Sequence, residues 1–448
     1  MMLQISTHSQ KDNEGKMSIE NKPAAFHADS KRAVTYMKEQ ITHICDRIPP
    51  REPGSIGERK TAEYMASVLE KDCGCDSADI ESFQVHPASF YGYCRIQGIL
   101  DFMSCAGFFI HPLITLICGG TSLLLFLLFF VLYIPMIDRF FPERTGTNVT
   151  AIRPCKGPVK RRVFFNGHMD AAWEFTLNYH FGGIVFEIPN VMSLVGVLVN
   201  ISMAICALCG AGDWTLTVMR WALLFIPSYI AIGLTFNPRH IVPGANDNLS
   251  GCLIGITILR EMEKQGIELE HTEAGVILTG SEEAGLRGSK AWCKAHRKDY
   301  QDVPTYIVSI DTIHSPEQLM VNVKDLNGTV SLDAPLSEAF MRAAQEVRVP
   351  CRKGKIPLFG GATDGAGFAQ GGFRTTSVTG LSHKLEDFYH TRRDTPDALN
   401  AKGLENCFKA AVRMIEIIDC GELDSFERSA GINSPEGMIP IRTDCCRK

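Results

Sequence analysis

Two long apolar stretches constrain the fold of this chain more than any other feature of its sequence. Residues 102–137 contain no Asp, Glu, Lys or Arg, and a second apolar stretch covers 191–236, interrupted by the run GAGDW at 210–214 and by Arg220. Buried core helices are shorter and amphipathic, whereas apolar runs of this length are typical of membrane-spanning helices. The sequence therefore predicts two membrane insertions, 102–137 and 191–236, in a chain that contacts the lipid bilayer.

The first insertion is too long for one straight crossing. A single helix of this length would measure roughly 54 Å, compared with roughly 30 Å of hydrocarbon in a bilayer. Pro112 lies in its first half and Gly119 and Gly120 lie near its middle, and both residue types interrupt helices. This predicts either a hairpin of two short helices or one spanning helix with an interfacial piece. The second insertion divides at 210–214 and predicts a helical hairpin.

Outside these insertions the chain alternates like a soluble α/β domain. Apolar residues recur at helical spacing in GERKTAEYMASVLEK and SGCLIGITILREMEKQG, and short β-rich runs occur in AGVILTG, TYIVSID and TTSVTGL. This alternation predicts an open, mostly parallel sheet with helices on both faces. We expect one catalytic domain built from 24–101, 138–190 and 237–430, a polar N-terminal tail at 1–23 and a C-terminal tail at 431–448.

Charge and composition narrow the class of protein further. The net charge of -5 over 448 residues offers no basic surface of the kind that nucleic-acid binding requires. The first 23 residues are polar and lack the apolar segment of a secretion signal, and the sixteen cysteines are scattered, so we expect a reducing compartment. The positive-inside tendency favours a multi-pass protein with its catalytic domain on the cytoplasmic side, since the domain-side ends of the insertions carry Arg95, Arg139, Arg144 and Arg239. Arg220 opposes this orientation.

Acidic and histidine residues follow the predicted strands at the points where those strands end. In α/β sheets the ligand site lies off the carboxyl ends of the strands, so side chains at these points can meet. Each alone has a structural explanation, as a helix cap, a turn residue or a solvated surface group. Together they form a set of imidazoles and carboxylates that suits zinc, and a carboxylate can bridge two ions. The set comprises His168, Asp170, Asp247, Glu282, Glu283, Asp311 and His390.

The stretches GHMD, GANDNLSG, GSEEAGLRGS, SIDTIH and YHTRRDT, which carry these residues, resemble the metal-site motifs of metallopeptidase family 28. The resemblance implies two zinc ions per chain, with Asp247 bridging them, His168 and Asp311 on one ion, and Glu283 and His390 on the other. It also implies that Glu282 is the general base for a zinc-activated water, and that Asp170 holds the His168 ring in its orientation.

The segment GGATDGAGFAQGG resembles the part of the family that lines the substrate pocket. Asp364 in this segment would contact substrate or support the site, although a turn residue in a flexible loop is an equal alternative. His383 and Glu386 have the same standing.

Three functions remain open from the sequence. The first is an aminopeptidase acting on peptides with a free N-terminus. The second is another amide hydrolase or a glutaminyl-cyclase-like enzyme on the same scaffold, because a fold does not determine a substrate. The third is a non-catalytic membrane receptor or scaffold. The ligand residues lie on both sides of each insertion and must meet, so each insertion is expected to cross the bilayer an even number of times or not at all.

Overall fold

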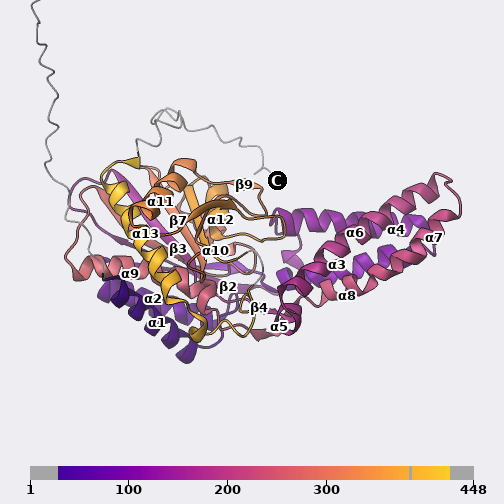
Figure 1. Cartoon of the computed structure of the whole chain (residues 1–448), viewed down its shortest axis with the longest axis horizontal. Coiled ribbons are helices and arrows are strands. Elements are labelled where there is room, and N and C mark those ends of the chain that lie inside the picture. Colours follow the sequence, from indigo (N-terminus) through magenta and orange to yellow (C-terminus); the bar gives the residue numbers. More distant parts are fainter. Residues whose placement is uncertain (1–28, 383–385, 424–448) are drawn as a thin grey trace, which may run out of the picture.

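The computed structural model describes residues 29–382 and 386–423. His383 and the two predicted tails, 1–23 and 431–448, lie outside these residues. The described chain forms an α/β domain and a helical arm that extends away from it (Figure 1).

A nine-stranded mixed sheet is the centre of the domain. Its strands run in the order β1 (Ala78–Val85), β2 (Arg144–Arg153), β6 (Thr272–Thr279), β3 (Arg161–His168), β7 (Thr305–Ile313), β11 (Arg374–Gly380), β8 (Met320–Asp325) and β10 (Arg352–Lys355), with β9 (Val330–Ser331) paired to β8. The neighbouring strands β6, β3, β7 and β11 are parallel, whereas β1, β2 and β8 join the sheet through antiparallel pairs. The mostly parallel sheet with helices on both faces is confirmed, with antiparallel pairing confined to the strands around its parallel centre.

Alternate residues of the buried strands supply two separate cores. Val163 and Phe165 of β3 belong to the larger core, while Phe164 between them packs on the opposite face with Trp292 and Phe368. The larger core lies under helices α1 (Ser30–Arg47), α2 (Ile56–Asp72), α9 (Ser250–Lys264), α11 (Ala334–Glu346) and α13 (Ala401–Asp419). The opposite face is covered by α10 (Arg287–His296) and α12 (Asp364–Gln370).

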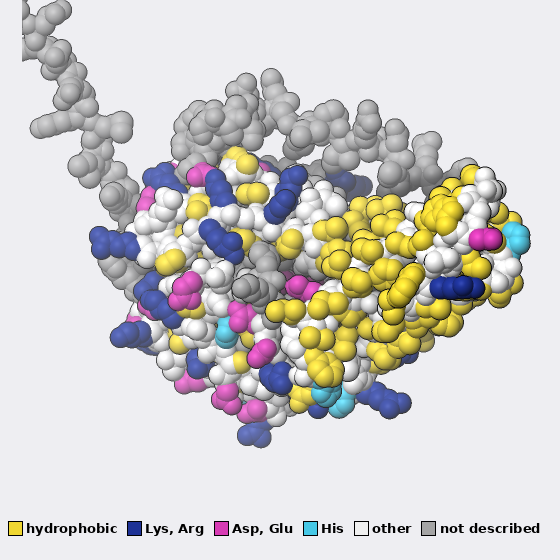
Figure 2. All heavy atoms as spheres, turned by 45° about the vertical axis from the view of Figure 1, so that its right-hand side comes forward, with side chains coloured by type: hydrophobic (Ala, Val, Ile, Leu, Met, Phe, Trp, Pro, Cys, Tyr) yellow, Lys and Arg dark blue, Asp and Glu magenta, His cyan; other side chains and the backbone are white. Residues whose placement is uncertain are grey.

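The arm consists of apolar helices from the two regions in which the sequence predicts insertions. It contains α3 (Ala88–Gly107), α4 (Pro112–Leu125) continued by η1 (Phe126–Val131), α6 (Gly183–Leu208), α7 (Trp214–Ala222), η3 (Leu223–Phe225) and α8 (Ile226–Gly233). Within the described residues, three helical stretches are long and apolar enough to cross a membrane: Pro112–Val131, Gly183–Leu208 and Trp214–Gly233. Hydrophobic side chains cover the visible face of the arm, whereas charged ones concentrate on the domain (Figure 2).

Both insertions begin earlier in the structure than hydropathy indicates. Helix α3 starts at Ala88 and α6 at Gly183, ahead of the expected starts at 102 and 191. The segment before 102 contains Arg95, Gln97 and Asp101, whose polarity hides a helix that continues into the arm. The break in the first insertion lies at residues 108–111, so Pro112 opens α4, while Gly119 and Gly120 lie inside that helix.

Close contacts and one buried polar cluster hold the arm helices together. Gly98 of α3 lies against the backbone of α8, where a Cβ atom would come within 2.5 Å of the Tyr229 carbonyl oxygen. The Asp101 carboxylate accepts hydrogen bonds from Ser122 of α4 and, at 2.6 Å, from Ser193 of α6. Three of the arm helices thus meet at one carboxylate.

The arm is also attached to the loops of the domain. Phe90 of α3 lies edge-on to Phe236, and Asn327 donates a hydrogen bond to the Phe130 carbonyl oxygen at 3.0 Å. The Lys290 ammonium donates to the Tyr133 carbonyl oxygen at 2.8 Å. Remaining short elements lie at this junction or in loops: η2 (Asp138–Phe140), α5 (Thr176–Phe181), η4 (Ala245–Leu249), η5 (Pro396–Ala398), and a two-stranded sheet of β4 (Trp173–Phe175) and β5 (Phe236–Ile241).

A pair of serines on α6 tests the role of the Asp101 cluster. Ser193→Ala should destabilise the arm by about 1–2 kcal/mol, because it leaves an oxygen of a buried carboxylate without its donor. Ser202→Ala should change stability by less than about 0.5 kcal/mol, since Ser202 is exposed and donates only to the Leu198 carbonyl of its own helix. Unfolding by SDS in mixed micelles, followed by tryptophan fluorescence, compares the two. Equal midpoint shifts would contradict a stabilising role for the cluster.

Candidate metal centre

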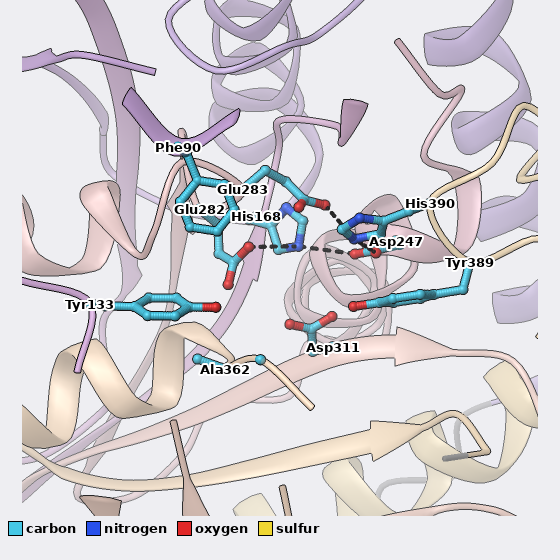
Figure 3. Close-up of a pocket in the computed structure, with 11 residues that line it drawn as sticks. Phe90, Tyr133, His168, Asp247, Glu282, Glu283, Asp311, Ala362, Tyr389 and His390 are labelled. Carbon is cyan, nitrogen blue, oxygen red and sulfur yellow. Dashed lines mark ion pairs between the residues drawn. The ribbon is translucent and has the colours of Figure 1, made fainter. Parts of the chain in front are cut away.

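The carboxyl ends of three neighbouring parallel strands bring most of the predicted ligands together. His168 is the last residue of β3 and pairs with Thr279, the last residue of β6, so the Glu282–Glu283 pair follows beside it. Asn166 of β3 pairs with Ser309 of β7, so Asp311, two residues further along β7, lies level with His168. Asp247 lies in η4, and His390 lies in the loop between β11 and α13. A single pocket is lined by six of the seven predicted site residues: His168, Asp247, Glu282, Glu283, Asp311 and His390 (Figure 3). The seventh, Asp170, does not line it.

The two oxygens of Asp247 face two different imidazoles. The His168 Nε2 atom lies 3.2 Å from Asp247 Oδ1, and the His390 Nε2 atom lies 3.1 Å from Asp247 Oδ2. Glu283 Oε1 lies 3.2 Å from His390 Nε2, and Glu282 Oε2 lies 3.9 Å from His168 Nε2. Asp247 therefore stands between a group around His168 and a group around His390.

Asp170 lies directly behind this pocket and connects its two halves. Its two carboxylate oxygens accept hydrogen bonds from the backbone N–H groups of Glu282 and Glu283, each at 3.1 Å. The His168 Nδ1 atom lies 3.2 Å from the Asp170 carbonyl oxygen and 3.5 Å from its carboxylate. A proton on Nδ1 is satisfied there, which leaves the Nε2 lone pair facing the pocket.

Asp394 plays the corresponding part behind Asp247. Its carboxylate accepts hydrogen bonds from the backbone N–H groups of Asn246 and Asp247, at 2.8 and 3.0 Å, and from the Asn246 side chain at 2.8 Å. Asp394 lies four residues after His390, within the same sequence motif. One short segment thus supplies one pocket imidazole and the group that holds the backbone of Asp247.

Burial and like charge perturb the ionisation of the whole cluster. Burial raises the pKa of Asp311 to about 8 and raises the pKa of Glu282 well above its usual value. Burial alone would lower the pKa of His168, but hydrogen bonds to Asp170 and Asp247 raise it well above its ordinary value. Burial likewise opposes ionisation of Asp247, yet the two imidazoles lower its pKa. Carboxylates this close and this buried can all carry charge only when cations compensate them.

The donor set fits bound zinc. The pocket offers imidazole nitrogens and carboxylate oxygens, the ligand types that zinc takes in proteins. Ligand atoms of His168, Asp247 and Glu283 all lie within 4.8 Å of one another. Glu283 Oε1 and His390 Nδ1 are buried and make no hydrogen bond to any described residue. Glu283 Oε1 has only the His390 imidazole beside it, at 3.2 Å, and a buried carboxylate oxygen without a hydrogen-bond donor fits a bound cation.

The backbone around the pocket departs from ordinary conformations at four non-glycine residues. Ser281, Thr312, His390 and Tyr133 have φ values of 56°, 48°, 49° and 49°. Side-chain-bearing residues occupy this region rarely, and such positions concentrate at functional sites, where surrounding contacts hold them. Tyr133 and His390 line the pocket, and Ser281 and Thr312 directly adjoin the pocket residues Glu282 and Asp311.

Aromatic residues from the arm and the domain form the remaining walls. Phe90 comes from α3 and Tyr133 from the segment after η1, whereas Tyr389 precedes His390 and stacks on its ring at 4.3 Å. The Tyr133 and Tyr389 hydroxyl groups point toward each other across the pocket, above Asp311 (Figure 3). The first insertion therefore contributes directly to the site.

The secondary candidates from the sequence lie beside the pocket. Asp364 is buried at the start of α12 and accepts a hydrogen bond from Thr279 at the end of β6, so it supports the strand ends. Glu386 accepts a hydrogen bond from Ser315 at 3.0 Å. Neither lines the pocket.

Sequence reasoning missed Glu58, Asp394 and the three aromatic walls. Glu58 is buried and accepts hydrogen bonds from the Thr147 N–H group at 2.8 Å and the Ser281 hydroxyl at 2.8 Å. Burial, reinforced by the charge of Asp170, raises the pKa of Glu58 to about 8. A glutamate on the buried face of an amphipathic helix was its only sequence signal. Asp394 was visible as the acidic residue of the YHTRRDT motif that carries His390.

Comparisons with known proteins agree with this architecture. Residues 233–415 match the model of peptidase family M28. The fold resembles that of an aminopeptidase from Aneurinibacillus sp. strain AM-1, at 14% identity over 88% of this chain and 96% of that one, with a TM-score of 0.52. A zinc aminopeptidase from Bacillus subtilis matches at 12% identity over 85% and 94% of the two chains, with a TM-score of 0.50.

A glutaminyl cyclase from Porphyromonas gingivalis also matches, at 11% identity over 88% of this chain and 99% of that one, with a TM-score of 0.50. At these identities the likeness shows a shared fold. No curated protein matches the chain significantly. The family match supports a hydrolase, and the His, Asp and Glu group together with the zinc aminopeptidase fold suggests zinc as its metal. Residues 233–415 thus match the sequence model of peptidase family M28, and the surrounding fold resembles that of aminopeptidases.

Proposed function

We propose that this protein is a membrane-anchored, zinc-dependent aminopeptidase that hydrolyses the amide bond after a free N-terminal residue. The observation that carries the proposal is the Asp247 carboxylate, which has an imidazole against each oxygen and the Glu282–Glu283 pair beside it. Such an arrangement supports two metal positions that share one carboxylate.

The proposed ligands divide on the two sides of Asp247. His168 and Asp311 would hold one zinc ion, and Glu283 and His390 the other. Bound zinc supplies Lewis-acid chemistry, which lowers the pKa of water and polarises a carbonyl group. Asp170 and Asp394 do not bind metal in this scheme but hold the ligands in position.

Glu282 is the proposed general base and acid. Its carboxylate lines the pocket but stays 3.9 Å from the His168 Nε2 atom, farther than the carboxylate of Asp247. Burial raises the pKa of Glu282 well above the usual value, which suits a group that must take and return a proton. Glu282 takes a proton from the attacking water while a C–O bond forms at the substrate carbonyl carbon. The C–N bond then breaks, and the proton passes from Glu282 to the leaving nitrogen.

The two phenols complete the proposed reaction site. The Tyr133 and Tyr389 hydroxyls point into the pocket, where they can donate hydrogen bonds to the carbonyl oxygen as it gains negative charge. Phe90 closes the wall beside Tyr133 and limits water access.

The membrane topology follows from the need to keep the ligands on one side. Three candidate spans would give an odd number of membrane crossings and would separate the ligands. The number becomes even if α3, which packs antiparallel to α4, is a fourth crossing. We propose two hairpins, α3 with α4 and α6 with α7–α8, and a catalytic domain on the cytoplasmic side. The charge distribution supports this, since Arg139 and Arg239 flank the domain-side ends while Asp213 lies in the distal turn.

Replacing the general base should separate chemistry from metal binding. Glu282→Gln should lower kcat about 10²–10⁴-fold, because the amide cannot accept the water proton, while zinc content remains near that of the unaltered protein. Steady-state kinetics and elemental analysis of purified protein measure both. Glu317→Gln, at an exposed position after β7, is the control and should match the unaltered protein. Full activity in Glu282→Gln would exclude this role.

Asp394 offers a test of positioning behind the metal site. Asp394→Asn turns an N–H group toward the Asn246 and Asp247 donors and should weaken zinc binding about 10–100-fold. Titration with a competing chelator gives the affinity, and added zinc should restore much of the activity. Asp397→Asn, three residues later and exposed, is the matched control. An affinity unchanged in Asp394→Asn would mean that the Asp247 loop holds its conformation without this carboxylate.

A panel of fluorogenic amino-acid amides tests the reaction class. The proposal expects turnover of amides with a free amino group, loss of turnover when that group is acetylated, and inhibition by zinc chelators. Turnover of blocked amides alone would contradict the aminopeptidase assignment. A peptide with N-terminal glutamine belongs in the panel, because release of a cyclised product instead of free glutamine would favour the cyclase chemistry named for one structural neighbour.

A further inference from the structure

A second, larger cavity adjoins the metal-centre pocket where the arm meets the domain. Its volume is about 510 Å³, within the range of small-molecule sites. Phe90, Tyr133, Gly361 and Tyr389 line both spaces, so the cavity shares a wall with the pocket. We refer to this space, bounded by α3, α4–η1, α6, α8 and the segment 357–361, as the arm cavity.

Hydrocarbon and aromatic side chains form most of the arm cavity. Helix α6 contributes Phe186, Leu194 and Val197, η1 contributes Phe126 and Phe130, and Ile232 comes from α8. All six of these residues lie in the candidate membrane spans. The cavity thus runs from the metal centre into the part of the molecule that would lie nearest the bilayer.

Several polar groups of the lining are already engaged within the arm. The Gln97 amide nitrogen and the Ser193 hydroxyl donate to Asp101 at 3.2 and 2.6 Å, and the Asn190 amide nitrogen donates to the Phe186 carbonyl oxygen at 3.0 Å. An extended peptide brings a donor and an acceptor with every residue, and burying these without partners is costly. A hydrocarbon chain brings none, so the lining favours a hydrocarbon chain over a peptide.

We infer that the arm cavity binds a single long hydrocarbon chain attached to the amide that is cleaved at the metal centre. The substrate class is an amphipathic amide, an amino acid joined through its amide bond to a fatty chain and drawn from the bilayer. The inference rests on the proposed amide hydrolysis and adds the substrate class to it. Val191 and Leu358 line the cavity and are 49% and 53% exposed, which places a route to the surface between α6 and the segment 357–361.

Chain length is the quantity to vary. Two series with the same amino acid place the chain on opposite sides of the amide: leucine alkylamides with a free amino group, and N-acyl-leucines. Each methylene buried in the cavity should raise kcat/KM about fourfold in one series until the cavity is filled. A response in the alkylamide series would place the chain on the nitrogen side of the amide, as the proposed aminopeptidase requires. A response in the N-acyl-leucines alone, whose amino group is blocked, would support the chain site but contradict the aminopeptidase assignment. Values of kcat/KM that do not rise with chain length in either series would overturn the inference.

Two tryptophan substitutions one turn apart on α6 separate the cavity from general hydrophobic attraction. Leu194→Trp fills the cavity and should lower the ratio of kcat/KM for the dodecyl over the butyl substrate at least tenfold. Leu198→Trp adds the same surface at a position that is 48% exposed and outside the lining, and should keep the wild-type ratio. Equal ratios in the two variants would show that chain preference arises from the micelle or the membrane surface.

A binding measurement keeps the two proposals distinct. A leucine dodecylamide with a diazirine near the chain end, photolysed on wild-type protein and mapped by mass spectrometry, should label α6 and η1 residues of the lining. Labelling without turnover of any amide would contradict the proposed function and leave the chain site standing. Turnover of short amides with no labelling of the lining would overturn the chain site and leave the function standing. Displacement of the label by phosphatidylcholine as readily as by unlabelled dodecylamide would identify a structural lipid site and overturn the inference.

Discussion

The contact of Asp247 with two imidazoles is the constraint on which the rest of the site depends. One carboxylate reaches His168 and His390 only if the end of β3, the loop before α9 and the loop before α13 meet at one point. These segments are far apart in the chain, and an insertion interrupts the path between His168 and Asp247. The parallel strands β6, β3 and β7 provide the common edge that brings them together.

The buried carboxylates of the pocket repel one another, and this explains why the residues behind the pocket bind the backbone of the loops that carry them. Asp170 and Asp394 are engaged by N–H groups of the same loops that carry Glu282, Glu283 and Asp247. Those hydrogen bonds position loops whose side chains repel one another in the absence of cations. The positive φ angles at Ser281, Thr312 and His390 fit the same picture, in which tertiary contacts hold strand-end loops in conformations that the chain alone would avoid.

The parallel centre of the fold and the convergence of these side chains on one pocket were predictable because both depend on local patterns. The strands that lead to His168, Glu282 and Asp311 are visible as apolar, β-branched runs, with an acidic or histidine residue at or just after the end of each run. The helix start at Ala88 was not predictable from hydropathy, since Gln97 and Asp101 of α3 are polar but buried against Ser122 of α4 and Ser193 of α6. The start of α6 at Gly183 was not predictable from hydropathy either. Glu58 was missed for the same reason, because its importance comes from contacts with Thr147 and Ser281, which are distant in the chain.

The arm extends from the domain and also contributes residues to the wall of the pocket. Phe90 and Tyr133 belong to the first insertion, and the Tyr133 carbonyl is held by Lys290 of α10 beside the Glu282–Glu283 loop. A pocket wall made by the arm makes the shape of the site depend on how the arm packs on the domain. Since the same residues also border the arm cavity, any movement of α3 or η1 changes both spaces at once.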